Sequence, residues 1–302
     1  MSENISKNKS ENKYSIKDFS TKEKPSWCPW CWDFTILNSL KWALNNLQIA
    51  PENTVLIAWI WCWALMPYWT KTYWMCTLHG RSIPVAKWVK LANKDLTVIV
   101  NAGDWDTLWI WIGHFSHSFR RNLDVTVLID NNWIYWLTKW QTSPASQKWT
   151  FSSSTPFWSI ETPVNWLALA TLMWATFVAR WFTWDQKWLT EIIEQAVQHK
   201  WTAIVDILQP CVTFNKVETY EYYFDKVQWV EENLETNWKK VISSREEAME
   251  ILTKVQEKIP VWIFYKEELP TYEDQCFQMD NESLVKQNID NIDVEKIMKQ
   301  FS

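Results

Sequence analysis

The chain has only 3 glycines among its 302 residues, where an average usage of about 7% would give roughly 21. Glycine enters left-handed backbone conformations at little cost, so tight turns and helix ends normally depend on it. The shortage therefore excludes a chain whose loops are built in the usual way. The same chain has 27 tryptophans. The deficit and the excess are of similar size, and we treat them as one anomaly.

Other absences exclude whole classes of protein. No apolar run approaches the roughly 18 residues that a membrane span needs, and residues 1–24 are polar without the apolar core of a signal sequence. The net charge of −5 lacks the basic excess of a nucleic-acid binder. Six cysteines are too few for a disulfide scaffold and favour metal or redox roles in a reducing compartment. We therefore expect a cytoplasmic protein with neither a nucleic-acid nor a membrane partner.

Many tryptophans stand where the backbone is expected to need glycine. Trp59, Trp61 and Trp63 follow a strand-like run, and Trp105 follows another. Trp201 ends a helical stretch, at a position where a left-handed conformation is common. Further cases surround turn-like segments: Trp133, Trp136, Trp140, Trp181, Trp184 and Trp188.

We interpret most of these tryptophans as standing for glycine in the working protein. Some bacteria read the UGA codon as glycine, whereas other codes read it as tryptophan, and translation with the wrong code would give this pattern. Deliberate substitution and a truly tryptophan-rich protein are the alternatives. Below, "glycine-read chain" means the chain with glycine at every tryptophan except Trp27, Trp42 and Trp69.

The pattern of apolar runs predicts an α/β fold. Strand-like runs occupy residues 54–58, 96–100, 125–129, 175–179 and 203–208, and helical stretches occupy 84–91, 110–121, 165–174 and 189–199. Such alternation is typical of a mostly parallel sheet with helices on both faces. We expect a disordered tail over residues 1–25, a domain over 26–215 and a charged C-terminal extension over 216–302 with a helix at 244–258 and a strand at 261–265.

Four cysteines form the first candidate site. Cys28 and Cys31 form a CxxC motif, and Cys62 and Cys211 each follow a strand-like run. Strand ends of an α/β sheet converge, so these thiolates can meet at one edge. The set suits a [4Fe–4S] cluster or a structural zinc, and a simple dithiol also stays open. Cys76 and Cys276 have no paired spacing, and we expect them to be free thiols.

A second candidate site follows two neighbouring strands. Asp104 lies in the run Gly103-Asp104-Trp105-Asp106, and Asn131-Asn132 follow the next strand. A carboxylate and an amide oxygen from these loops could hold one Mg²⁺, which prefers hard oxygen ligands and keeps phosphates in its coordination sphere. A small residue at position 105 would let the backbone approach a diphosphate. An ordinary strand-end turn is the alternative.

With tryptophans 30, 32, 59, 61, 105, 111, 136, 140 and 262 taken as glycine, the chain resembles the β subunit of 2-oxoacid:ferredoxin oxidoreductases over roughly residues 26–275. The matching segments are residues 27–32, 59–62, 77–81, 103–106, 114, 120–122, 131–132, 134–141, 208–215 and 261–265. Most mismatches are a tryptophan at a family glycine, while Trp27 matches a family tryptophan.

The resemblance implies a thiamine-diphosphate-binding fold and assigns roles to individual residues. It implies that one [4Fe–4S] cluster is bound by Cys28, Cys31, Cys62 and Cys211. Mg²⁺ would be held by Asp104, Asn132 and the backbone carbonyl of Ile134. The cofactor would be lined by Ile60, Trp61, Cys62, Trp63, His79, Gly103, Trp105, Asp106, Trp136 and Leu137. Lys139 would contact the charged end of the substrate.

The implied activity is the oxidative decarboxylation of a 2-oxoacid, either 2-oxoglutarate or pyruvate, to acyl-CoA and CO₂. Its implied partners are an α subunit, coenzyme A and ferredoxin. Leu65 stands where the family usually has a basic residue, which puts any role of that position in doubt. Competing hypotheses are a non-catalytic four-cysteine metal protein, a degenerate partner subunit and a thiamine enzyme without a cluster. His114 and His117 lie one helical turn apart, and we interpret them as packing or surface residues.

Overall fold

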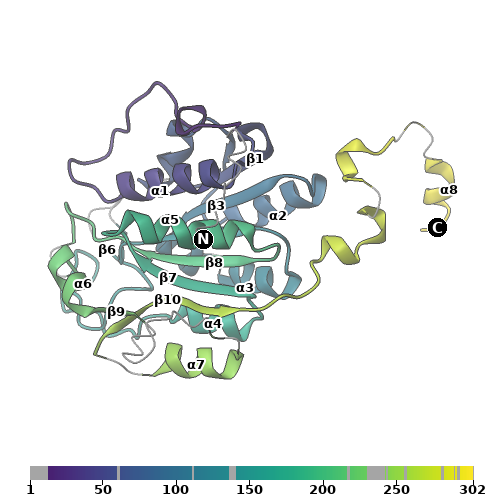
Figure 1. The fold of residues 1–302 in the computed structure, drawn as a ribbon. Coiled ribbons are helices and arrows are strands. Elements are labelled where there is room, and N and C mark those ends of the chain that lie inside the picture. Colours follow the sequence, from purple (N-terminus) through teal and green to yellow (C-terminus); the bar gives the residue numbers. More distant parts are fainter. Residues whose placement is uncertain are drawn as a thin grey trace, which may run out of the picture.

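The computed structural model describes residues 13–59, 62–110, 112–135, 141–215, 218–229, 242, 244–254, 257–279, 282–288, 290 and 293–301. An eight-stranded sheet runs through this part of the chain in the order β2-β1-β3-β4-β8-β7-β10-β9 (Figure 1). Its strands are β1 (Thr54–Ala58), β2 (Tyr73–Cys76), β3 (Thr97–Gly103), β4 (Thr126–Asn131), β7 (Phe177–Phe182), β8 (Ala203–Leu208), β9 (Val227–Trp229) and β10 (Ile259–Lys266). A separate ribbon joins β5 (Ile134–Tyr135) to β6 (Gln141–Thr142).

The sheet is mostly parallel, as the sequence predicts. From β2 to β7 every neighbouring pair runs parallel, and β10 alone among these pairings runs antiparallel to its neighbour β7. Every residue of β1, β4 and β8 is buried. Continuous burial is typical of parallel strands whose two faces are both covered.

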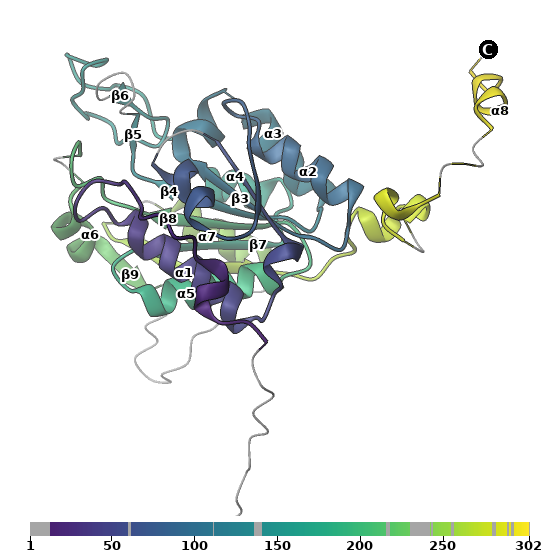
Figure 2. The same ribbon diagram turned by 90° about the horizontal axis from the view of Figure 1, so that it is seen from above.

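Helices cover the sheet on both faces (Figure 2). On one face α1 (Asp33–Asn46) packs against α5 (Gln186–Gln198). On the other, contacts run in series through α2 (Ser82–Ala92), α3 (Ile112–Arg121), α4 (Trp166–Leu172) and α7 (Arg245–Thr253). The shorter α6 is Tyr220–Lys226 and α8 is Val294–Met298. Side chains that accept a backbone N–H begin five of these helices, as N-cap residues do: Asn165, Asp185, Thr219, Ser244 and Asp293.

The predicted elements are confirmed with small shifts in their ends. Strands 54–58 and 203–208 have the predicted bounds, while the helix expected at 244–258 ends at Thr253. The strand expected at 261–265 is longer, as β10, and lies inside the main sheet together with β9. No helix in the described part of the chain is long and apolar enough to cross a membrane.

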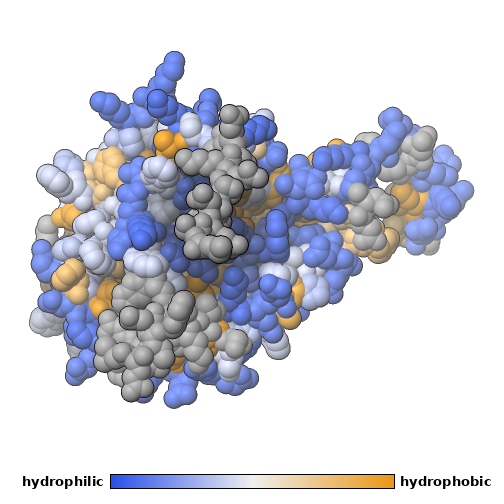
Figure 3. Space-filling model, viewed as in Figure 1, coloured by the Kyte–Doolittle hydropathy of each residue, from blue (hydrophilic) through white to orange (hydrophobic). Residues whose placement is uncertain are grey.

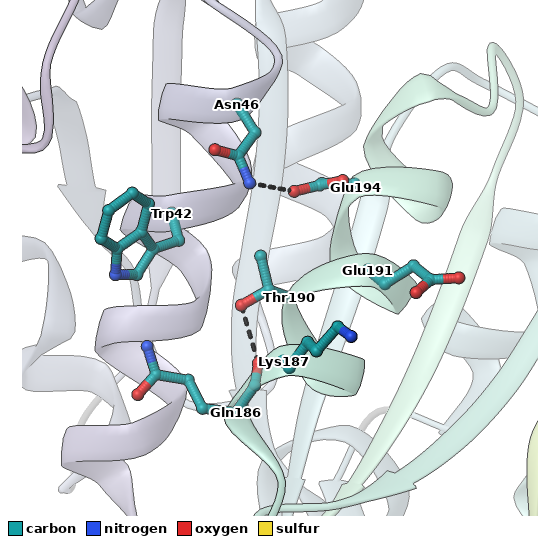
Figure 4. Close-up of a pocket in the computed structure, with 7 residues that line it drawn as sticks. All are labelled: Trp42, Asn46, Gln186, Lys187, Thr190, Glu191 and Glu194. Carbon is teal, nitrogen blue, oxygen red and sulfur yellow. Dashed lines mark hydrogen bonds between the residues drawn. The ribbon is translucent and has the colours of Figure 1, made fainter.

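A hollow of about 500 Å³ opens between α1 and α5 (Figure 4). Its walls come from the outer sides of the two helices, where Asn46 donates a hydrogen bond of 2.6 Å to Glu194 and Trp42 covers the α1 side. None of the predicted site residues lines it. We therefore interpret this hollow as a gap in the packing of α1 against α5 and not as part of the candidate site.

The C-terminal segment leaves the body of the molecule after β10 (Figures 1 and 2). Its surface is largely hydrophilic with separate apolar patches (Figure 3). Phe277, Val294, Met298 and Phe301 are among its exposed apolar side chains. The segment therefore presents apolar groups that the rest of the described chain does not cover.

Backbone geometry singles out a group of tryptophans. Of the eight non-glycine residues described with positive φ, six are tryptophan. They are Trp30 (66°), Trp133 (60°), Trp149 (69°), Trp158 (65°), Trp174 (72°) and Trp262 (135°), and the other two are Gln48 and Asn122. A side chain in this region costs roughly 1–2 kcal/mol, which glycine avoids. The six positions therefore have the backbone conformation that glycine favours.

The expectation for Trp201 is wrong. It does not have a positive φ, because α5 ends at Gln198 and His199 leaves it with an extended backbone. Trp181 lies inside β7 and Trp188 inside α5, on either side of a turn at residues 183–184, as the sequence predicts. Both pack against Trp262, at ring-centre distances of 6.0 and 5.7 Å, with Trp181 buried and Trp188 partly buried.

We predict that Trp158→Gly stabilises the full-length chain by about 0.5–1 kcal/mol. The substitution relieves the backbone strain of a positive φ at a half-exposed residue. Glycine also gives the unfolded chain more conformational freedom, which offsets part of this stabilisation. Trp88→Gly is the matched control. Trp88 is also exposed but lies within α2, where glycine destabilises by about 0.5 kcal/mol. Urea unfolding measures both, and equal destabilisation would contradict the strain argument.

We further propose that the tryptophan excess arises from UGA codons that are read as glycine in the source. The expected observation is UGA in the gene at residues 30, 32, 61, 105, 136 and 140. Sequencing the gene at these positions tests the proposal directly. Uniform UGG there would leave substitution by design or a truly tryptophan-rich protein.

Candidate active site

The candidate site lies at the carboxyl edge of the sheet, where β1, β3, β4 and β8 end side by side. Cys62 follows β1, Asp104 follows β3, Asn132 follows β4 and Cys211 follows β8. Carboxyl ends of parallel strands form the usual ligand-binding edge of an α/β sheet. Five of the predicted site residues lie outside the described residues: Ile60, Trp61, Trp136, Leu137 and Lys139.

Asp104 links three segments of this edge. It is buried and accepts a 2.5 Å hydrogen bond from the Ser143 hydroxyl and a 2.9 Å bond from the Trp105 N–H. The backbone N–H of Trp133 also donates to it. Burial raises the pKa of Asp104 to about 7, although these hydrogen bonds act in the opposite direction. The carboxyl group is thus held rigidly at the end of β3, beside the loop that contains Asn132.

Asn132 and Ile134 follow β4 in the same region. The Asn132 carbonyl accepts a 3.4 Å hydrogen bond from the Asn215 side chain, which joins this loop to the segment after β8. Ile134 begins β5 and pairs with Thr142, so its backbone lies near the loop that contains Ser143. Oxygen donors from both strand ends thus share one edge, as a magnesium site requires.

Asp106 organises the loop after β2. Its Oδ1 lies 2.8 Å from His79 Nδ1 and also accepts the N–H of Gly80, whose φ is 71°. Its Oδ2 accepts a 3.2 Å bond from the hydroxyl of Ser82, the first residue of α2. Asp106 is buried, so these bonds are shielded from water. It therefore fixes His79 in place at the edge of the site.

Trp105 stands where the sequence predicts a close approach to phosphate. It stacks on Trp109 with ring centres 4.9 Å apart, and both rings line a hollow of about 330 Å³ beside Gln141 and Ser143. Gly103 has free space around it, since the nearest atom to an added Cβ is the Asp130 carbonyl oxygen at 4.0 Å. The indole of Trp105 thus occupies space next to Asp104.

The four predicted cysteine ligands come from three loops at this edge, and all four are half-buried free thiols. Trp27 holds two of the loops together, because its indole N–H donates a 2.5 Å hydrogen bond to the Cys62 carbonyl. The same indole packs edge-on against Phe34 and Trp69. Trp27 is thereby a buried anchor of the CxxC segment.

The sulfur atoms are close enough to influence one another. Burial raises the pKa of the Cys62 thiol to about 12, with further contributions from Asp33, Asp130, Cys211 and Cys28. Burial also raises the pKa of Cys31 and of Cys211. Among the described residues, no group of three or more His, Cys, Asp and Glu side chains is arranged to hold a metal ion. The donor chemistry nevertheless suits a cluster, since four thiols share one edge and backbone N–H groups donate to Cys31 and Cys211.

Two residues of the site have no role in the sequence-based prediction. Ser143 holds Asp104, and Gln209 donates to both Cys31 Sγ (3.5 Å) and Asp33 Oδ1 (3.2 Å). Both lie inside or directly beside the motifs that carry the family resemblance. A motif shows that a position matters, but only the fold shows which atom it contacts.

Comparison with known proteins agrees with this geometry. Residues 54–207 match the thiamine pyrophosphate enzyme C-terminal TPP-binding domain, and residues 211–281 match the C-terminal part of the pyruvate ferredoxin oxidoreductase β subunit. The 2-oxoacid:ferredoxin oxidoreductase β subunit of Saccharolobus solfataricus is 39% identical over 82% of this chain and 84% of its own length. The chain belongs to this β-subunit family.

Other relatives and a solved structure agree. The 2-oxoglutarate oxidoreductase subunit KorB of Mycobacterium tuberculosis is 43% identical over 66% of this chain and 53% of its own length. The structure of 2-oxoglutarate:ferredoxin oxidoreductase from Magnetococcus marinus, with 2-oxoglutarate, coenzyme A and succinyl-CoA bound, superposes with a TM-score of 0.86. It is 33% identical and covers 96% of this chain and 97% of that one. The similarity confirms the predicted family and the thiamine-diphosphate-binding fold.

Proposed function

We propose that this β subunit binds Mg²⁺–thiamine diphosphate and one [4Fe–4S] cluster, and that with an α subunit it converts a 2-oxoacid and coenzyme A into acyl-CoA and CO₂ while reducing ferredoxin. The observation that carries the proposal is the meeting of two donor sets at one sheet edge, oxygens after β3 and β4 and thiols after β1 and β8. The family membership supports an enzyme over a non-catalytic metal protein or a degenerate partner subunit.

The oxygen donors fit a magnesium diphosphate. Asp104, Asn132 and the Ile134 carbonyl would hold the ion, and Asp106 would keep His79 at the diphosphate side. Thiamine diphosphate supplies the carbon that attacks the 2-oxoacid and holds the electrons left after CO₂ departs. This chain's residues hold the diphosphate end, while Ser143 fixes the orientation of Asp104. The roles of Ile60, Trp61, Trp136, Leu137 and Lys139 remain part of the proposal.

The thiols fit an electron-accepting cluster beside that site. Asp130 lies within electrostatic reach of both Asp104 and Cys211, so the two donor sets share one buried region. This proximity suits the passage of single electrons from the thiamine side to the cysteines. The relatives named after 2-oxoglutarate make that compound the first 2-oxoacid to test.

Exposed apolar groups support the need for a partner subunit. The edge strand β2 is exposed along its whole length and presents Tyr73, Trp74 and Met75. An edge strand has no neighbouring strand on one side, and when it also presents apolar side chains it is a natural site for protein association. We propose that the α subunit covers apolar surface of this kind and that the isolated β chain is inactive.

We predict that Asp104→Ala or Asn132→Ala, in the glycine-read chain co-expressed with its α subunit, loses thiamine diphosphate but keeps the cluster. Each change removes a magnesium ligand, and the ion needs near-octahedral oxygen coordination. Restoring glycine everywhere except position 105 should have the same effect, because the indole fills space beside Asp104. Two measurements test these variants: the thiamine diphosphate content after gel filtration, and the rate of ferredoxin reduction with 2-oxoglutarate and coenzyme A.

Asp124→Asn is the matched control for the magnesium variants. Asp124 pairs with Lys90 at 2.7 Å and precedes β4, at the opposite edge of the sheet. The control should retain the cofactor and its activity. Full cofactor retention in either site variant would show that the magnesium ligands are wrongly assigned.

The cluster assignment is tested by two cysteine variants in the same complex. We predict that Cys211→Ser lowers iron and acid-labile sulfide, because it removes one of four thiolate ligands. Cys276→Ser should leave both unchanged, since Cys276 lies far along the C-terminal segment and bonds locally to Gln278. Equal iron and sulfide in the two variants would contradict the ligand set, and zinc without sulfide would favour a structural metal.

A further inference from the structure

Several hydrogen-bond donors point at the cysteine sulfurs. Backbone N–H groups of Thr213, Phe214 and Asn215 donate to Cys211, and the N–H of Asp33 donates to Cys31. These donors belong to the main chain and cannot be removed by changing a side chain. Gln209 adds a side-chain donor, with its Nε2 3.5 Å from Cys31 Sγ.

Gln209 also donates to a buried carboxylate next to this sulfur. Its Nε2 is 3.2 Å from Oδ1 of Asp33, which is fully buried as the first residue of α1. One amide group with two hydrogens can serve both acceptors at once. Gln209 itself is 3% exposed, so water competes little for either bond. The amide therefore donates to two neighbouring groups that are both negative when the cysteine is a thiolate.

We propose that Gln209 is a positioning residue that sets the reduction potential of the cysteine-bound cluster by donating one N–H to Cys31 Sγ and the other to the Asp33 carboxylate beside it. The inference rests on the proposed [4Fe–4S] cluster. Reduction adds one negative charge to the cluster, and a donor aimed at a ligand sulfur stabilises that charge. Removing the donor makes the reduced form less favourable and lowers the potential.

The test uses Gln209→Leu and Gln209→Glu in the glycine-read complex with its α subunit. Leucine removes the donor, and glutamate keeps the shape while placing an acceptor beside the sulfur. We expect both variants to keep the iron and sulfide of the parent complex. In a dithionite titration followed by electron paramagnetic resonance, the ratio of reduced to oxidised cluster at a fixed potential should fall about tenfold, which corresponds to about 59 mV for one electron.

Gln48→Glu is the matched control at the opposite end of α1. Gln48 also donates through its side chain, to the carbonyls of Tyr14 and Asn45, but faces no cysteine. Its potential should equal that of the parent. An unchanged potential in both Gln209 variants, or loss of the cluster from both, would overturn the role of Gln209. A parent complex without iron and sulfide would instead overturn the proposed cluster, and the inference with it.

Discussion

Burial of carboxyl groups at one edge of a parallel sheet is the constraint on which the site depends. Asp33, Asp104, Asp130 and Asp206 are all buried there, and burial raises the pKa of each. Arg180 compensates Asp206 at 2.6 Å. Asp33 and Asp104 accept hydrogen bonds but form no ion pair within the described chain, and Oδ1 of Asp130 has no hydrogen-bond partner among the described residues. An edge of this kind favours the binding of cations.

The register of the sheet separates these groups into two sets. Neighbouring residues in register share a face of the sheet, and successive residues alternate between faces. Asp206 pairs with Ile129 and Arg180, one residue out of step with Asp130, which pairs with Ile207. The pKa of the Cys62 thiol is raised by Asp33 and Asp130, and the pKa of Asp104 is raised by Asp206. Asp130 interacts with Asp104 as well as with Cys211, so the thiols and the oxygen donors are coupled across one sheet edge.

The sequence predicts the framework of this arrangement better than its contacts. Apolar runs such as 54–58 and 203–208 are stable only as buried strands of a parallel sheet covered on both faces. The cysteine and Asp104 motifs come directly after such runs, so the sequence also predicts that they lie at strand ends. The antiparallel placement of β10 beside β7 depends on packing far along the chain, which no local pattern contains. The bonds of Ser143 to Asp104 and of Gln209 to Cys31 span 39 and 178 residues, so only the folded chain reveals them.

The tryptophans show where sequence and fold disagree. Trp133 combines a φ of 60° with a buried indole N–H that has no hydrogen-bond partner in the described chain, and its own backbone N–H donates to Asp104. Backbone strain and an unpaired buried donor each cost on the order of 1–3 kcal/mol. Glycine at this position would remove both costs and keep the N–H that holds Asp104. Because the backbone bond serves the site and the indole does not, the geometry of residue 133 supports glycine as the residue for which this loop is shaped.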